Sequence, residues 1–400
     1  MVIFRNIISE LEADADRSEI VVLLGPRQVG KTTVMLELER RLRERGRKTA
    51  FFDLEQPGIL AGFNRPDAEI VERLLSAAEV IFIDEFQYLP NASSLLKAVY
   101  DSRRGIKVFC SGSSAIEIHS HLKESLAGRR HLVRMFPMTC VELAPIGRTF
   151  AEYLVYGGMP GLLNADDDLR RQRILEELLG SYIFKDVKSL IREENLRAFN
   201  HFMYLLAQNQ GSVVSVHSLA SEVGLSSSSL NRYLDILEST YVNFRVPSYS
   251  CNLGNELKKS FKTYLYDNGM RNSILKDFSA LHTRSDKGIL HESHVFLTLL
   301  ARRLPNEEIR FWRTREGDEV DFVLVRDRHP IPIEVKSGVS GAVIPKGLGR
   351  FLKRYQVPHA FVINETLSTQ IQPDATVIHF MTFDEFSRFA AEPQVFNSFQ

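Results

Sequence analysis

Residues 19–46 read EIVVLLGPRQVGKTTVMLELERRLRERG, and this stretch decides the expected fold. Residues 19–24 form a short apolar run, which is typical of a strand buried on both faces. A turn with two glycines follows directly, and the residues after it have helical spacing up to Gly46. A strand, the pattern G-x-x-x-x-G-K-T and a helix in this order predict a loop that wraps phosphate groups.

The predicted phosphate-binding loop suits ATP. Backbone N–H groups freed by the glycines can surround the phosphates, and the start of the following helix favours negative charge. We expect Lys31 to reach the β- and γ-phosphates and Thr32 to place its hydroxyl on Mg²⁺. A chance glycine-rich turn would not need the flanking strand and helix. The predicted nucleotide-binding residues are Gly25, Pro26, Arg27, Gln28, Val29, Gly30, Lys31, Thr32 and Thr33.

A second apolar strand, residues 80–83, ends in the two carboxylates Asp84 and Glu85. Unpaired charge at the end of a buried strand is costly and therefore needs a reason. We expect Asp84 to hold Mg²⁺ through water and Glu85 to polarise the water that attacks the γ-phosphate. The alternative is an acidic strand end beside a helix N-terminus.

Polar residues also follow the strand predicted for residues 106–110. A side chain at this strand tip can lie near the γ-phosphate, and Ser111 is the candidate, with Ser113 as the other choice. A helix N-cap explains these serines equally well. Residues 49–54 predict the strand that follows the first helix.

These motifs together resemble the AAA+ branch of P-loop ATPases, in which a further strand lies between the motif strands and a polar tip follows. The segment LAGRR, residues 126–130, is similar to the arginine segment of that branch. The resemblance implies that Arg129 or Arg130 is an arginine finger for the γ-phosphate, within its own chain or from a neighbouring subunit of a homo-oligomer. A basic surface turn is the alternative.

Composition limits the remaining choices. A chain of 400 residues suggests two or three domains, and 44% hydrophobic with 25% charged residues is ordinary for a globular protein. Lys plus Arg equals Asp plus Glu at 50 each, so any surface for nucleic acid must be local. No apolar run approaches the ~18 residues that span a bilayer. No signal pattern or C-x-x-C pair occurs, so a reducing cytoplasm is the expected setting.

The middle of the chain predicts a helix-turn-helix. Residues 195–246 have the pattern of three helices and a strand, with Gly224 at the tight turn before the third helix. In a DNA-binding module this third helix would present Arg232 to the major groove. The alternative is a winged-helix module used for packing or as a lid. The expected domains are an ATPase core (1–145), a helical lid (146–194), a winged helix-turn-helix (195–250) and a nuclease-like domain (251–400).

Residues 317–338, GDEVDFVLVRDRHPIPIEVKSG, place charges within two apolar strands. Glu334 and Lys336 are two apart on one strand and therefore share a face, toward which Asp321 of the neighbouring strand can converge. With Glu292 from the preceding helix, this is the order of the PD-(D/E)XK nuclease core. The carboxylates of Glu292, Asp321 and Glu334 would hold Mg²⁺, and Lys336 would stabilise charge. A solvent-facing hairpin with an ordinary Glu–Lys pair is the alternative.

A short stretch just before this hairpin predicts a contact surface for nucleic acid. Trp312, Arg313 and Arg315 would form a basic, aromatic rim, and DNA is the expected partner.

The motifs span almost the whole chain. Together they resemble a widespread family of bacterial and archaeal predicted ATPases whose C-terminal domain is of unknown function. The expected fold class is α/β: a P-loop AAA+ ATPase domain, a winged-helix middle and a restriction-endonuclease-like α/β C-terminal domain. The expected function is a Mg²⁺-dependent ATPase coupled to a DNA-acting, nuclease-like domain. The alternatives are a nucleotide switch whose C-terminal domain only docks a protein or DNA, and a signalling ATPase like those of programmed-death pathways.

Overall fold

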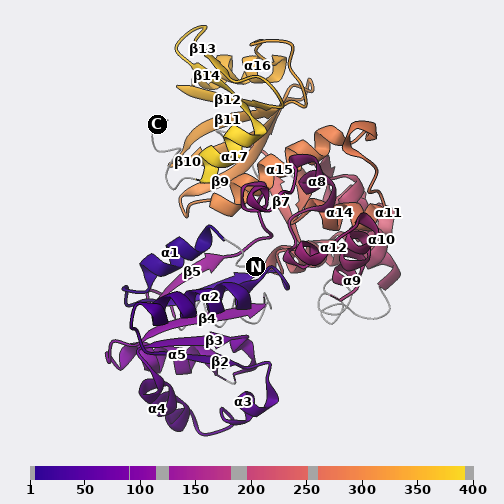
Figure 1. Cartoon of the computed structure of the whole chain (residues 1–400). Coiled ribbons are helices and arrows are strands. Elements are labelled where there is room, and N and C mark those ends of the chain that lie inside the picture. Colours follow the sequence, from indigo (N-terminus) through magenta and orange to yellow (C-terminus); the bar gives the residue numbers. More distant parts are fainter. Residues whose placement is uncertain (1–4, 90, 114–125, 182–195, 251–259, 392–400) are drawn as a thin grey trace. The chain divides into compact units, whose positions relative to one another are not determined.

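The computed structural model describes residues 5–89, 91–113, 126–181, 196–250 and 260–391. The chain divides into two compact units (Figure 1). Unit 1 comprises Met1–Met138 and Ser239–Val242, and unit 2 comprises Thr139–Glu238 and Asn243–Gln400. The helix expected after the Ser111 strand and the end of the expected lid, residues 182–194, lie outside the described residues.

Unit 1 contains a parallel sheet whose strands follow the order β2-β3-β4-β1-β5. The strands are β1 Ile20–Gly25, β2 Thr49–Asp53, β3 Val80–Asp84, β4 Lys107–Ser113 and β5 Arg130–Arg134. Its helices are α1 Ile7–Asp14, α2 Lys31–Glu44, α3 Pro57–Ala61, α4 Asp67–Ala77 and α5 Ala92–Asp101, with the 3-10 turn η1 Phe86–Tyr88. The apolar runs predicted as buried strands are β1 and β3, and every residue in both is buried.

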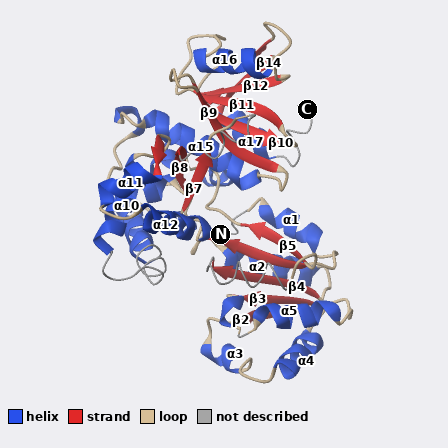
Figure 2. Ribbon diagram, turned by 180° about the vertical axis from the view of Figure 1, so that it is seen from behind, coloured by secondary structure: helices blue, strands red, loops and turns tan. Residues whose placement is uncertain are grey.

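The strand order explains how distant motifs meet. Strand β4 lies between β1 and β3, as the resemblance implies. Because all pairings in this sheet are parallel, the carboxyl ends of β1, β3 and β4 share one edge. Helix α2 packs on the sheet through its apolar stripe, which includes Val34, Leu38 and Leu42. Figure 2 shows the strands of unit 1 side by side in one layer, with helices packed beside that layer.

The first part of unit 2 is mainly helical. Its elements are α7 Cys140–Leu143, η2 Ala144–Ile146, α8 Phe150–Tyr156, η3 Pro160–Asn164, α9 Asp168–Leu178, α10 Leu196–Gln208, β6 Val213–Ser215, α11 Val216–Val223, α12 Ser227–Ser239, β7 Asn243–Pro247, β8 Ser260–Leu265 and α14 Asn268–Leu275. Gly224 ends α11 in the left-handed conformation, with φ 71°. The antiparallel sheet β6-β8-β7 takes its middle strand from beyond residue 250, so the expected boundary there divides one sheet.

The last part of unit 2 is a mixed sheet with the order β13-β14-β12-β11-β10-β9. Its elements are η7 Leu281–Thr283, α15 Lys287–Arg302, β9 Glu307–Arg313, β10 Glu319–Arg326, β11 His329–Val335, α16 Lys346–Tyr355, β12 His359–Asn364, β13 Thr369–Ile371, β14 Val377–Thr382 and α17 Phe383–Ala391. Strands β9, β10 and β11 pair antiparallel, whereas β11, β12 and β14 pair parallel.

Two apolar clusters cover this mixed sheet. One contains Phe296 and Phe322, and the other contains Trp312 and Phe351. Trp312 is only 3% exposed, so the expectation of an aromatic rim there is wrong: its indole packs edge-on against Phe351 in the core. Among the described helices of both units, none combines the length and apolar character that crossing a membrane requires.

Candidate nucleotide site and C-terminal acidic centre

The phosphate-binding loop follows β1 and leads into α2. Gly30 is the N-cap of α2 with φ 91°, and Gln28 has φ 61°, so the backbone turns through two left-handed positions. A Cβ added at Gly25 would lie 2.0 Å from the carbonyl oxygen of Met135. Glycine is therefore required at position 25 because the segment after β5 passes directly beside it.

Lys31 lies at the beginning of α2 and is buried. Its Nζ donates hydrogen bonds to the carbonyl oxygens of Gly25 at 3.0 Å and Pro26 at 2.8 Å. Burial lowers the pKa of Lys31 to about 8, although the charges of Glu85 and Asp84 act in the opposite direction. The loop thus holds a cation whose charge the protein compensates incompletely.

Arg5 supports the loop and was missed by sequence reasoning, because no motif includes it. Its guanidinium donates to the carbonyl oxygens of Val29 at 2.9 Å and Phe136 at 2.7 Å, and the side chain is buried. These bonds join the loop to the segment after β5.

The predicted acids and the predicted serine meet at the same sheet edge. Ser111 Oγ donates to Asp84 Oδ1 and accepts a hydrogen bond from the backbone N–H of Glu85 at 3.3 Å. Glu85 has φ 53°, and its Oε2 accepts from Gln87 Nε2. Ser111 therefore fixes the end of β3 against β4.

The nucleotide site fits Mg²⁺. Thr32 and Thr33 are exposed on the first turn of α2, and Asp84 is buried at the end of β3. A hydroxyl and a carboxylate are the oxygen ligands that Mg²⁺ takes when phosphates supply further oxygens.

Arg129 lies at the other end of the sheet. Strand β5 begins beside Ile20, the first residue of β1, and the backbone oxygen of Arg129 accepts from Ile20 N at 2.9 Å. The loop follows the last residue of β1, so roughly 16 Å of strand separates the two ends. The guanidinium of Arg129 pairs instead with Asp101 at 2.9 Å. The expectation that Arg129 or Arg130 reaches the γ-phosphate of its own chain is therefore wrong, and only action from a neighbouring subunit stays a prediction.

Three of the predicted nuclease residues lie close together in unit 2. Asp321 Oδ2 accepts a hydrogen bond from Val335 N at 2.8 Å, and Glu334 pairs with Lys336 at 2.8 Å. Burial, together with the charge of Asp321, raises the pKa of Glu334 to about 8. Glu334 Oε2 is buried and has no hydrogen-bond partner among the described residues.

Lys262 on β8 is the main residue that sequence reasoning missed at this centre. Its Nζ lies 2.8 Å from Glu292, 2.7 Å from Glu319 and 3.6 Å from Asp321. The side chain of Lys262 is 1% exposed. Tyr264, two residues further along β8, donates to Glu292 Oε1. The alternation in residues 261–265 contained the signal, because a lysine inside a buried strand requires carboxylates around it.

We call the set Lys262, Glu292, Glu319 and Asp321 the acidic centre. As arranged, it does not fit a divalent cation. Within the described ranges no group of three or more His, Cys, Asp or Glu side chains is placed to hold a metal ion. Glu292 and Asp321, two of the predicted ligands, face the ammonium of Lys262 instead.

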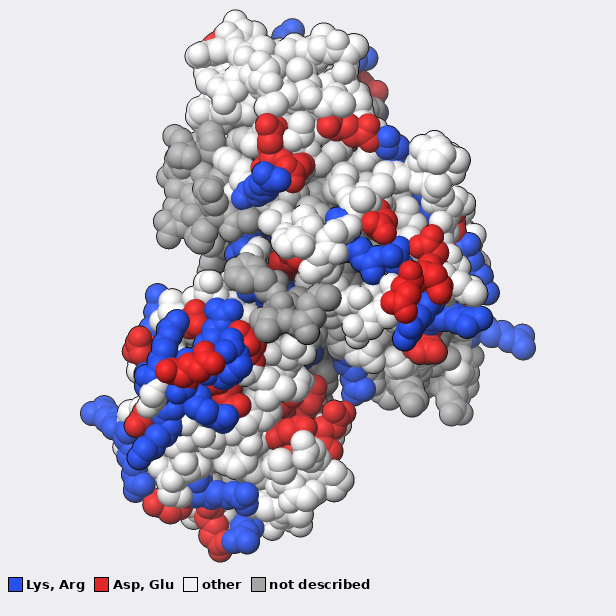
Figure 3. Space-filling view, in the orientation of Figure 1, with Lys and Arg blue, Asp and Glu red and all other residues white. Residues whose placement is uncertain are grey.

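The residues predicted to contact nucleic acid lie on different elements of unit 2. Arg232 is exposed on α12, and Arg315 is exposed in the turn between β9 and β10. Arg313 is 47% exposed and lies 3.4 Å from Glu319. Figure 3 shows basic and acidic side chains intermixed over unit 1, where arginines of α2 pair with glutamates of the same helix. That helix surface is therefore not a basic patch.

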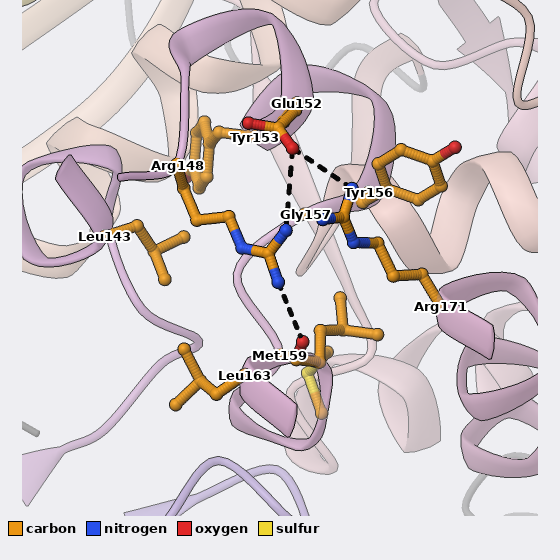
Figure 4. Close-up of a pocket in the computed structure, with 10 residues that line it drawn as sticks. Leu143, Arg148, Glu152, Tyr153, Tyr156, Gly157, Met159, Leu163 and Arg171 are labelled. Carbon is orange, nitrogen blue, oxygen red and sulfur yellow. Dashed lines mark hydrogen bonds and ion pairs between the residues drawn. The ribbon is translucent and has the colours of Figure 1, made fainter. Parts of the chain in front are cut away.

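A pocket in unit 2 contains none of the predicted site residues. It has about 330 Å³ of space, open solvent included, and lies among α8, η3 and α9. Arg148 and Arg171 both point toward the carboxylate of Glu152, at 3.5 and 3.1 Å (Figure 4). Leu143, Met159 and Leu162 supply apolar walls.

Family models match the chain in three adjacent parts. An AAA domain matches residues 17–144, a domain of unknown function (DUF8612) matches residues 147–281, and another (DUF4143) matches residues 287–383. The chain therefore contains an AAA domain and a C-terminal DUF4143 domain, which confirms the resemblance stated from the motifs. The α/β fold class is confirmed by the parallel sheet of unit 1 and the mixed sheet of unit 2, each with its helices.

Relatives extend over most of the chain. An uncharacterised protein of Mycobacterium tuberculosis is 25% identical over 375 residues, covering 91% of this chain and 82% of the relative. One of Haemophilus influenzae is 24% identical over 354 residues, covering 81% and 86%. Among solved structures, Aeropyrum pernix ORC1 in complex with DNA gives a TM-score of 0.31 at 14% identity, covering 68% of this chain and 91% of that chain. AMPPCP-bound DnaA from Aquifex aeolicus gives 0.28 at 11%, covering 58% and 86%.

Proposed function

We propose that this chain, with its AAA domain, hydrolyses ATP with Mg²⁺ and that the nucleotide cycle acts on a nuclease-like, DNA-acting C-terminal domain. The observation that carries the hydrolysis proposal is the grouping at one sheet edge. Lys31 at the start of α2, Asp84 at the end of β3 with Glu85 directly after it, and Ser111 of β4 are positioned by three neighbouring parallel strands.

Each side chain of this group has a role that its surroundings support. Lys31 would neutralise charge on the β- and γ-phosphates, because its own charge is incompletely compensated. Thr32 and Asp84 would hold Mg²⁺, which supplies further charge neutralisation when bound. Glu85 would orient the attacking water, and Ser111 keeps Asp84 in place through its hydroxyl.

Two variants separate nucleotide binding from hydrolysis. Lys31→Ala should weaken ATP binding and abolish Mg²⁺-dependent phosphate release, whereas Glu85→Gln should bind ATP normally and lose hydrolysis. Phosphate release and the binding of a fluorescent ATP analogue are the two measurements. Hydrolysis by Glu85→Gln at the wild-type rate would contradict the role given to Glu85. Absence of hydrolysis by the wild type, with and without DNA, would sink the proposal.

The element order of unit 2 supports a DNA-acting module. Glu292 on helix α15, Asp321 on β10 and Glu334 on β11 follow the order expected for the PD-(D/E)XK core. Helices α10 to α12 with the sheet β6-β8-β7 have the order of a winged helix. Labelled single-stranded, duplex and branched DNA, with Mg²⁺ or Mn²⁺ and with or without ATP, tests this module: cutting by the wild type that Asp321→Ala loses would assign the cutting to the C-terminal domain and would require Lys262 to leave these carboxylates during the reaction. The Lys31→Ala variant would report whether ATP controls cutting.

A second candidate function is a nucleotide-dependent switch whose C-terminal domain docks a protein or DNA without cutting. The contact of Lys262 with Glu292, Glu319 and Asp321 favours it, because an ammonium fills the position among these carboxylates. In this case DNA would stay intact, Asp321→Ala would keep the biological activity, and Lys31→Ala would lose it.

A further inference from the structure

The acidic centre contains its own cation. Three carboxylates from two elements, Glu292 on α15 and Glu319 and Asp321 on β10, surround the Nζ of Lys262. The lysine side chain is 1% exposed, so water contributes little to its solvation. Charged groups removed from water require partners of opposite charge, and here the carboxylates supply them.

A second observation is a buried carboxylate oxygen near the acidic centre that accepts no hydrogen bond within the described residues. Glu334, on the strand next to Asp321, is 4% exposed, and its buried Oε2 has no hydrogen-bond partner in the described part of the chain. Its other oxygen pairs with Lys336. A buried carboxylate with a free oxygen beside Asp321 is what a cation site offers, yet the ammonium of Lys262 lies nearer to Glu292 and Glu319 than to Asp321.

The cation comes from a different sheet. Lys262 and Tyr264 lie on β8, the middle strand of the sheet β6-β8-β7, whereas Glu319 and Asp321 belong to the mixed sheet. The side chains of both β8 residues reach Glu292. The acidic centre therefore fastens the helix-turn-helix part of unit 2 to the nuclease-like part.

We propose that Lys262 is the resident cation of the acidic centre, so that the centre is closed to divalent cations while the Lys262 side chain remains in place. The ammonium lies within 2.8 Å of Glu292 and 3.6 Å of Asp321, so these carboxylates already have a cation, and it links the two sheets. Opening the centre then requires that the Lys262 side chain leaves these carboxylates. This inference rests on the proposal that the C-terminal domain is nuclease-like, and it decides between the cutting and docking functions.

The test is a Mn²⁺ titration of the full, nucleotide-free chain, followed by the electron paramagnetic resonance signal of free Mn²⁺. All proteins carry Asp84→Asn, so that the nucleotide site contributes no ion. The wild-type centre should show no binding that depends on Asp321, whereas Lys262→Met should bind Mn²⁺ at least about tenfold more tightly. Adding Asp321→Asn to Lys262→Met should abolish the gain.

Lys336→Met is the matched control. It removes the same charge from the same region, but Lys336 is 44% exposed and pairs with Glu334. An equal gain in Mn²⁺ affinity in both lysine variants would overturn the proposal, since it would reflect net charge alone. Mn²⁺ binding by the wild type that Asp321→Asn removes would overturn it as well. Neither readout needs ATP hydrolysis or DNA cleavage, so failure of those activities is distinguishable.

Lys262→Met leaves three carboxylates close together and could fail to fold in metal-free buffer. In that case the same variant is refolded with Mn²⁺, because metal binding contributes directly to folding free energy. Recovery that depends on Mn²⁺ and on Asp321 supports a cation position at this centre. Failure to recover with Mn²⁺ overturns it.

Discussion

Lys31 in unit 1 and Lys262 in unit 2 are both buried beside carboxylates, but the balance of charge around them differs. Lys31 donates to two neutral carbonyls, and burial lowers its pKa to about 8 against the pull of Glu85 and Asp84. Burial would also lower the pKa of Lys262, yet Glu292, Asp321 and Glu319 together raise it above the usual value for lysine. Lys31 is thus under-compensated, which suits an anionic ligand, whereas Lys262 is fully compensated by its own chain.

This contrast explains why the role of Lys31 was predicted from the sequence, whereas the strand pattern around Lys262 could indicate a buried lysine but not its partners. A ligand-binding lysine needs a loop of fixed local geometry, and the loop is continuous in sequence at residues 25–33. The partners of Lys262 lie on α15 and β10, which are contributed by distant stretches of chain. Charge balance assembled through tertiary structure leaves no local motif.

The largest expected effect is the loss of catalysis without loss of fold in unit 1. Lys31→Met should reduce ATP hydrolysis by about 100-fold or more, as expected for removing one group that stabilises transition-state charge. Its unfolding free energy should fall by no more than about 1 kcal/mol. Removing a desolvated cation stabilises the fold, and this offsets the loss of the donor that Lys31 supplies to two carbonyls. Hydrolysis rates and hydrogen exchange of β1 and α2 amides check this.

The opposite outcome is expected at the acidic centre. Lys262→Met should lower the local unfolding free energy by roughly 3–5 kcal/mol, since it leaves buried carboxylates without their cation. Hydrogen exchange of β8 and α15 amides in metal-free buffer is the measurement, because it reports on each region of a two-unit chain. Lys336→Met, with its exposed ammonium, should change it by less than about 1 kcal/mol. Equal effects of Lys262→Met and Lys336→Met would contradict the view that the buried carboxylates depend on Lys262.

His294 tests what burial does to a base whose hydrogen bond goes to a serine. It accepts or donates one hydrogen bond with Ser387 at 2.9 Å and packs edge-on against Phe150 and Tyr153. Burial, with the nearby His291, lowers the pKa of His294 to about 3. The folded pKa lies below the unfolded one near 6.5, so the unfolded state takes up the proton first and stability falls as the pH drops below about 6.5.

The expected loss from His294 is about 2 kcal/mol of unfolding free energy between pH 7 and pH 5. Denaturation of wild type and His294→Asn across this range measures it as a difference in slope, and His282→Asn at an exposed position is the control. Asp267 acts in the opposite direction, because burial raises its pKa to about 6, but it contributes equally to all three proteins. Parallel slopes for wild type and His294→Asn would contradict the assignment.

The sequence predicted unit 1 better than unit 2 for a physical reason. Strands β1 and β3 of unit 1 are buried on both faces, so they are visible as continuous apolar runs with functional residues at or directly after their ends. In unit 2, Asp321, Glu334 and Lys336 were located from strand alternation, but the alternation did not reveal which cation they face. Trp312 was misplaced because an aromatic residue beside arginines has the same pattern on a rim and in a core.

Arg129 gives the smallest expected effect and separates action within one chain from action between chains. Its guanidinium pairs with Asp101 at the amino end of the sheet, away from the loop that holds Lys31. Arg129→Ala should therefore leave ATP hydrolysis by isolated chains within about twofold of the wild type. Loss of the exposed pair with Asp101 should cost less than about 1 kcal/mol of stability, so the fold is kept. If a neighbouring subunit supplies this arginine, wild-type hydrolysis per chain rises with protein concentration and Arg129→Ala loses only that rise. A large loss at the lowest concentration would instead require the arginine to reach its own nucleotide, against the strand register of β5 with β1.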